Sequence, residues 1–233
     1  IPPSIIMIVY GVTANVSIAQ LFIAGVIPGL LLAGLFMAYT IVWALLHPDQ
    51  IPPADQNLSF LQKLAASRHL IPVVALIAAV LGSIYTGLAT ATEAAGLGVV
   101  GAMIIAAIQG EMNWKNFRDS LLGATRLYCM IALILAGAAF LTLSMGYIGL
   151  PRHLAEWIGS LGLSPFALVL ALMAFFIILG CFLDGISIVV LTMGILLPTV
   201  EKAGIDLIWF GIYVVLVVEM AQITPPVGFN LFV

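Results

Sequence analysis

Side chains that carry neutral oxygens cluster around a double proline near the end of this chain, in an otherwise apolar stretch. Residues 219–230 read Glu-Met-Ala-Gln-Ile-Thr-Pro-Pro-Val-Gly-Phe-Asn. Adjacent prolines remove backbone N–H donors and clash with preceding carbonyls, so a helix here is predicted to break at about residues 222–224. The freed carbonyls can coordinate sodium together with Gln222, Thr224 and Asn230. The simpler alternative is a proline kink that serves only packing.

A second polar interruption is Gly180-Cys-Phe-Leu-Asp-Gly185, in the middle of the apolar stretch 164–200. At about 1.5 Å per residue that stretch is too long for one straight crossing of a hydrocarbon core about 30 Å thick. A re-entrant hairpin with arms at about 166–179 and 186–198 would place Asp184 at its tip, at membrane depth. Asp184 is then an ion or proton site, or an N-cap of the second arm. The two roles are compatible.

Other polar residues in the apolar stretches have weaker claims to function. The chain opens on a similar break, Ile1-Pro-Pro-Ser4, and Glu219 lies one turn before the later one. Intramembrane carboxylates are functional candidates, but Glu93 follows Thr90 and Thr92 and is also suited to capping a helix. The glycines of residues 96–101 are expected to pack helices, because no strand precedes them as a nucleotide-binding loop requires.

Composition places the whole chain in a lipid bilayer. Hydrophobic residues make up 64% of the 233, charged residues 7%, and the mean hydropathy is +1.26, against about 45–50% and about 25% in soluble domains. The net charge of −3 argues against a nucleic-acid surface. Cys129 and Cys181 have no metal-site spacing and are expected to be buried free thiols. No HExxH or GxSxG motif is present, so the chain is predicted to be no enzyme and to need no cofactor besides a coupling ion.

These candidate residues must be positioned by helices. The apolar stretches predict an all-α polytopic membrane protein with discontinuous helices. The expected elements are a half-span at 2–11, a helix at 18–46, crossings at 70–86, 93–109 and 127–147, the hairpin 164–200, and a broken helix at 207–233. The polar connector 47–69 is expected to hold a surface helix at 58–66, and residues 109–126 and those after 147 are expected to be loops.

Loop charges orient this layout in the membrane. Five of the seven Lys and Arg residues fall on one side, which the positive-inside rule makes cytoplasmic. The break at Pro2-Pro3 then runs outward and the break at Pro225-Pro226 runs inward. Two similar breaks of opposite direction are typical of an inverted repeat.

Several motifs resemble the large membrane subunit of the TRAP (tripartite ATP-independent periplasmic) transporters, the DctM-like family. The resemblance runs through the whole chain in consistent order and rests on Ile1-Pro-Pro-Ser-Ile-Ile-Met-Ile-Val-Tyr-Gly11, Leu21-Phe-Ile-Ala-Gly-Val-Ile-Pro-Gly-Leu30, Ala91-Thr-Glu-Ala-Ala95, Phe182-Leu-Asp-Gly185 and Thr224-Pro-Pro-Val-Gly-Phe-Asn-Leu-Phe232. It implies a sodium-coupled importer of organic anions, such as C4-dicarboxylates or sialic acids, in the bacterial inner membrane. The implied partners are a periplasmic substrate-binding protein and a small DctQ-like membrane subunit.

The resemblance also implies an elevator mechanism, in which a transport domain slides against a scaffold. Residues 1–46 would end the first inverted repeat, 47–69 would be a cytoplasmic connector, 70–147 would be scaffold-type helices, and 164–233 would belong to the transport domain. The chain begins with Ile and stops in an apolar run, so it is expected to be a fragment that lacks the first hairpin and the last helix. The candidate ion and substrate residues are Pro3, Ser4, Gly180, Asp184, Gln222, Thr224, Pro225, Pro226, Gly228 and Asn230, with sodium expected at Gly180, Asp184, Gln222, Thr224 and Asn230.

Two alternatives remain open. The chain could be another ion-coupled permease of inverted-repeat architecture that works without a binding protein. It could also be a structural membrane subunit of a larger complex, with polar breaks that serve only helix packing.

Overall fold

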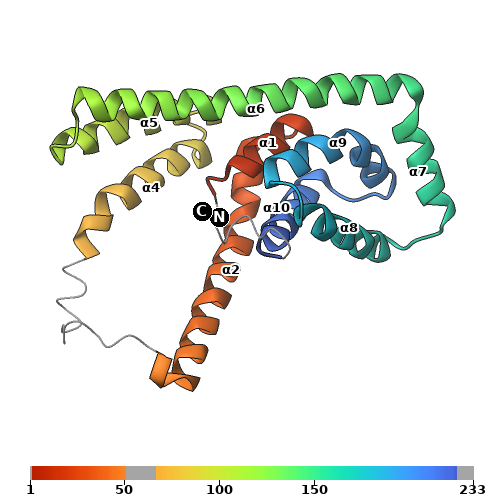
Figure 1. Ribbon diagram of the computed structural model, residues 1–233, viewed down its shortest axis with the longest axis horizontal. Helices are drawn as coiled ribbons and strands as arrows, with labels where there is room; N and C mark the ends of the chain where they lie inside the picture. The colour runs from red at the N-terminus through yellow and green to blue at the C-terminus, as the bar shows by residue number, and fades with distance from the viewer. Residues whose placement is uncertain (1, 51–66, 225–233) are drawn as a thin grey trace. The chain divides into compact units, whose positions relative to one another are not determined.

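The computed structural model describes residues 2–50 and 67–224, which form helices joined by short connections (Figure 1). No strand occurs in these two ranges, so the predicted all-α fold is confirmed. The surface helix expected at 58–66 lies outside them. The helices are α1 (Ile5–Thr13), α2 (Ile18–Leu46), α4 (Ile71–Tyr85), α5 (Ala91–Ile108), α6 (Trp114–Ile148), α7 (Leu150–Ser160), α8 (Pro165–Gly180), α9 (Gly185–Lys202) and α10 (Leu207–Ile223), with short 3-10 turns at Pro48–Gln50 and Ser67–Leu70.

Several of these helices are suited to a membrane. Helices α2, α5, α6 and α9 are long and apolar enough to cross one, and most of their neighbours are shorter apolar helices. Half of the apolar window of α9 is buried inside the protein, against 6% of that of α6. Helix α9 is therefore a core element, whereas α6 presents most of its side chains outward.

The chain divides into two compact units, the first formed by residues 26–119. In this unit α4 and α5 pack together as a helix hairpin. A Cβ added at Gly101 would overlap the side chain of Leu76, and one at Gly98 would lie 3.4 Å from Val80 Cγ2. The expectation that the glycines of residues 96–101 pack helices is confirmed at these two positions.

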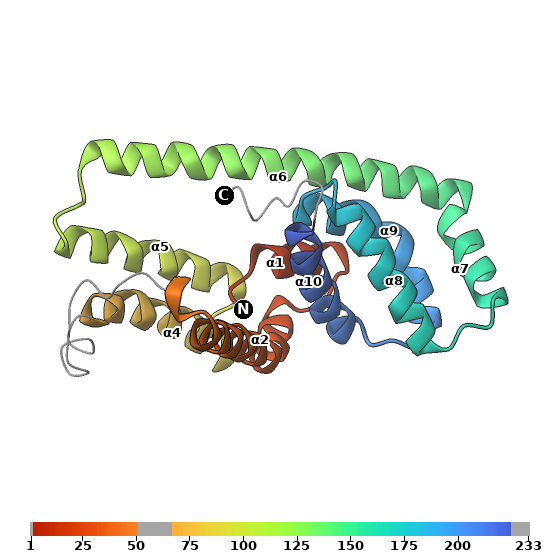
Figure 2. The same cartoon turned by 60° about the horizontal axis from the view of Figure 1, so that its bottom comes forward.

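The second unit combines residues 2–25 with residues 120–224. Helices α8 and α9 form a hairpin, α10 packs against both arms, and α1 packs against α9 and α10 (Figure 2). Large side chains from all four helices fill the core without measurable exposure, among them Tyr10, Phe176, Ile188, Met193 and Phe210.

Tyr10 links the two helices that were predicted to be broken, α1 and α10. Its hydroxyl donates to the carbonyl of Leu207 at 2.7 Å, and its ring lies edge-to-face with Phe210 at 6.4 Å between centroids. A Cβ at Gly211 would lie 2.5 Å from Tyr10 Cε1, so the tyrosine ring can occupy this position only because residue 211 has no side chain. The start of α10 is thereby fixed to α1.

Two predicted loops are wrong. Helix α6 begins at Trp114, so most of the loop expected at 109–126 is helical, started by Asn113 accepting from the Asn116 N–H at 2.8 Å. Its 35 residues span about 52 Å, well beyond a core of about 30 Å. The charged residues of this stretch lie on a helix that extends past the hydrocarbon, and their polarity alone does not indicate a loop.

The loop expected after residue 147 instead holds α7, an amphipathic helix. It starts at Gly149, whose φ of 76° is readily adopted by glycine, and it buries Pro151 and Ala155 while exposing Arg152. Proline in the first turn and apolar residues at spacings of three and four were a readable signal for this helix. Both cysteines are free, but neither is buried as expected: Cys181 is half-buried, and Cys129 is exposed because most side chains of α6 point outward.

The predicted hairpin and the predicted end of the last described helix agree with the structure. The hairpin arms expected at 166–179 and 186–198 are α8 and α9, the second continuing through Pro198 to Lys202. Helix α10 ends at Ile223, and Thr224 is extended with ψ of 134°, within the break predicted at 222–224.

The end of α8 lies against the end of α10 with no room for a side chain. A Cβ added at Gly180 would overlap that of Ala221 and would also approach the Cα and carbonyl carbon of Ala221 to 3.2 Å. Because backbone atoms are involved, rotation of a side chain cannot relieve the contact. Gly180 and Ala221 therefore set the distance between the hairpin and the end of α10.

Gly180→Ala is expected to lower the thermal stability of the protein, by about 1–3 kcal/mol for an overpacked contact. Gly137→Ala is the matched control, because that glycine of α6 has nothing within 4 Å of an added Cβ. Helix propensity should make the control neutral or stabilising. Thermal unfolding of the purified proteins measures both, and equal melting temperatures would refute the close contact.

Candidate functional site

Asp184 occupies the turn between α8 and α9 and caps α9. Its Oδ2 accepts from the backbone N–H groups of Ile186 and Ser187, both at 3.1 Å, and its Oδ1 accepts from Ser187 Oγ at 2.5 Å. The helix N-terminus favours this carboxylate through its orphan N–H groups and its dipole. Both oxygens keep lone pairs, so the capping geometry leaves the proposed ion role open.

The start of α9 packs against the ends of two other helices. A Cβ added at Gly185 would lie 2.8 Å from Gln222 Nε2, 2.8 Å from Ile6 Cδ1 and 2.9 Å from Val218 Cγ1. Gln222 is 8% exposed. The structure therefore brings two predicted site elements together, the tip of the hairpin and the end of α10, with the first turn of α1 beside them.

Thr224 ends α10 and keeps acceptor capacity. Its N–H donates to Ala221 O at 3.0 Å, and its hydroxyl donates to Met220 O at 3.0 Å. A hydroxyl that gives its proton to a carbonyl still has lone pairs to offer a cation. The C-terminal end of a helix also carries partial negative charge. Asp184 adds a carboxylate at the hairpin tip, which packs against the end of α10. The carboxylate oxygens, the Thr224 hydroxyl and the end of the helix together suit a cation.

Helix α1 begins after the predicted first break. Ser4 is extended with φ of −128° and ψ of 131°, and its side chain makes no capping hydrogen bond. Pro3 is exposed and Pro2 is buried. Pro225, Pro226, Gly228 and Asn230 lie outside the described residues.

The two weaker carboxylate candidates differ in their surroundings. Glu93 forms a capping box with Thr90: its Oε2 accepts from the Thr90 N–H and Oγ1, both at 2.8 Å, and Thr90 Oγ1 accepts from the Glu93 N–H at 3.3 Å. Capping accounts for Glu93. Glu219 is half-buried on α10, one turn before the helix ends. Within the described ranges, no three His, Cys, Asp or Glu side chains group as a metal site.

Sequence reasoning missed two residues that shape this site. Ser187 donates to Asp184, and Ala221 provides the small surface against which Gly180 packs. The spacing of three between Asp184 and Ser187 was a readable capping signal. Nothing in the sequence marked Ala221 among the many alanines.

Comparison with known proteins gives a family for the whole chain. The family model described as "Tripartite ATP-independent periplasmic transporter, DctM component" matches residues 1–233. The C4-dicarboxylate TRAP transporter large permease protein DctM of Pseudomonas aeruginosa is 35% identical over 234 residues, which are 100% of this chain and 54% of the relative. The chain thus spans about half the length of most of the curated relatives that it matches.

Two further relatives carry other names. The isethionate TRAP transporter permease protein DctMQ of Oleidesulfovibrio alaskensis is 33% identical over 237 residues, 100% of this chain and 36% of the relative. The ectoine/5-hydroxyectoine TRAP transporter large permease protein UehC of Ruegeria pomeroyi is 32% identical over 237 residues, 100% of this chain and 54% of the relative. With its apolar helices and this end-to-end match, the chain is a multi-pass membrane protein that belongs to the DctM family of TRAP transporter large permeases.

Proposed function

We propose that this chain belongs to the large membrane subunit of a sodium-coupled importer of organic anions. The observation that supports a coupling site is the packing of Gly185 against Gln222 and Ile6. Through this contact the hairpin tip lies beside the start of α1 and the end of α10. Irregular backbone at membrane depth persists only in protein or beside a watery cavity. Asp184, Gln222 and Thr224 add oxygens there. The proposed sodium ligands also include Gly180 through its backbone and Asn230 through its side chain.

The rest of the transport cycle is proposed from the family. A periplasmic binding protein would deliver the anion, and a small DctQ-like subunit would assemble with this one in the bacterial inner membrane. The relatives are named for C4-dicarboxylate, isethionate and ectoine, so organic acids are the class to assay first. Residues 164–233 with 2–11 would move as a transport domain in an elevator mechanism, and the opposed breaks would reflect inverted repeats.

Uptake by the complete complex in liposomes tests this function against its alternatives. Labelled C4-dicarboxylates and sialic acid are offered with and without an imposed sodium gradient and with and without the binding protein. Uptake that needs both supports the proposal. Flux that persists without the binding protein indicates a different ion-coupled permease. No sodium effect on flux or on thermal stability indicates a structural subunit.

Thr224→Val in the complete complex is expected to raise the half-saturating sodium concentration roughly threefold or more, because one oxygen ligand is lost at nearly constant volume. Thr125→Val is the control, since Thr125 makes the same kind of bond to Leu121 O, at 2.8 Å, far along α6. Asn230→Leu should behave as Thr224→Val does. Unchanged sodium dependence in both site variants would remove them from the proposed site.

Substitution of Asp184 separates charge from capping. Asn caps a helix about as well as Asp, so Asp184→Asn should keep the melting temperature while weakening sodium binding by roughly tenfold, about 1.4 kcal/mol. Asp184→Ala should lose about 1 kcal/mol of stability as well. If Asp184→Asn binds sodium as the parent does, Asp184 is a cap only.

The re-entrant path of α8 and α9 is testable by labelling. In the full-length permease, freed of its accessible native cysteines, single cysteines are placed at Ser160 and Lys202. Both are expected to react with a membrane-impermeant maleimide from the periplasm, because the hairpin enters and returns on one side. Reaction from opposite sides would show that residues 164–200 cross the membrane instead.

A further inference from the structure

Helices α7, α8 and α9 border an open hollow that the proposed ion site does not use. Its volume is about 450 Å³, and its lining is almost wholly apolar, including Trp157 and Ile158 of α7, Ala171 and Phe175 of α8, and Leu191 and Ile195 of α9. A hydrocarbon chain matches this lining, because the lining offers almost no polar group that would need a partner.

The hollow becomes polar in steps along α7. Ile158, Leu163 and Leu168 also line a neighbouring hollow of about 200 Å³, which is bordered by Thr199 and Lys202. Lys202 and Ala155 in turn line a third of about 350 Å³, with Arg152 and Glu156. One continuous lining thus leads from an apolar end, past a hydroxyl, to a charged end.

The hydroxyl in the middle of this path has an unmet bonding need. Thr199 is 4% exposed, and its Oγ1 is buried without a hydrogen-bond partner among the described residues. A buried polar group left without a partner is destabilising, because it has given up its hydrogen bonds to water without replacing them. Most helical threonines avoid this cost by bonding a carbonyl one turn back, as Thr192 does to Ile188 O at 2.7 Å. The unpartnered Thr199 therefore points to a missing ligand oxygen.

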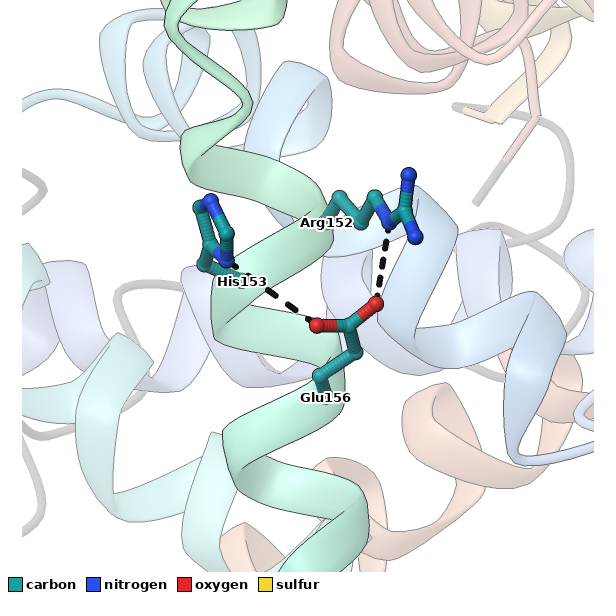
Figure 3. A network of polar contacts seen from close by, with 3 residues as sticks. All are labelled: Arg152, His153 and Glu156. Carbon is teal, nitrogen blue, oxygen red and sulfur yellow. Dashed lines mark hydrogen bonds and ion pairs between the residues drawn. The ribbon is translucent and has the colours of Figure 1, made fainter.

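The charged end presents cations with one carboxylate between them. Arg152 Nε donates to Glu156 Oε1 at 2.9 Å, and His153 Nδ1 lies 3.9 Å from Glu156 Oε2 (Figure 3). The hydrogen bond from Arg152 lowers the pKa of the Glu156 carboxyl, and the charge of Lys202 lowers it further. With Glu156 paired to Arg152, the charged lining keeps one net positive charge, which Lys202 supplies toward a phosphate.

We propose that this groove of α7, α8 and α9 holds one phospholipid, with an acyl chain in the apolar hollow, its ester oxygens at Thr199 and its phosphate at Lys202. The order apolar, hydroxyl and cationic along the groove is the order of these parts in the lipid. Amphipathic helices such as α7 lie at the level of lipid headgroups, which places the polar end at the right depth. Because an acyl chain is already surrounded by apolar groups in a bilayer, retention depends on the polar end.

The probe is a phosphatidylethanolamine with a diazirine on one acyl chain, added to the complete complex in nanodiscs. Peptide mapping after illumination is expected to find the lipid on α7 and α8. Ala171→Trp, which fills the hollow, should reduce this labelling about tenfold, while Ala174→Trp, one turn away and outside the lining, should leave it unchanged. Ala171→Leu provides a milder block if Ala171→Trp fails to assemble, as judged by gel filtration.

Variants of the polar end give a second, independent measure. Lys202→Gln is expected to reduce labelling and the phospholipid retained in native mass spectrometry about threefold to fivefold, and Thr199→Val about twofold. Glu201→Gln is the control for Lys202. Equal labelling in Ala171→Trp and Ala174→Trp, no effect of Lys202→Gln, or a parent groove that carries no lipid because a protein segment fills it would each overturn the proposal.

Discussion

Interruptions of apolar helices leave backbone N–H and C=O groups that hydrocarbon cannot satisfy, and the second unit of this structure is built around such groups. Each orphan group costs several kcal/mol in lipid. At the hairpin tip Asp184 accepts the first N–H groups of α9, and at the end of α10 the Thr224 hydroxyl bonds a carbonyl of the last turn. The polar side chains at the breaks thus form hydrogen bonds with backbone groups, and their remaining lone pairs are available to a cation.

Close approach of helices follows from small residues rather than from hydrophobic attraction, which is weak between helices in lipid. Gly180 meets Ala221, Gly185 meets Gln222, and Gly211 makes room for Tyr10. These three glycines lie at the joints between the hairpin, α10 and α1. The same small residues therefore determine both the stability of the unit and the distances between the oxygens of the proposed site.

The two functions proposed for the second unit use opposite ends of α9. Its N-terminus, capped by Asp184, faces the ends of α10 and α1, whereas its C-terminal turns, with Thr199 and Lys202, border the groove of α7 and α8. A lipid held there would contact the hairpin but no proposed sodium ligand. Loss of the lipid and loss of sodium coupling can accordingly be measured separately.

The sequence by itself determined the membrane class, the family resemblance, and most helix ends, because these depend on local properties: apolar run length, prolines, and capping residues such as Thr90 and Asp184. It misjudged the start of α6 and overlooked α7, because polarity was taken for a loop where a helix extends beyond the hydrocarbon. Only the tertiary structure decided which breaks meet. The packing of Gly185 on Gln222, the choice of Ala221 as the partner of Gly180, and the unpartnered hydroxyl of Thr199 depend on contacts between residues distant in the chain, which no local pattern encodes.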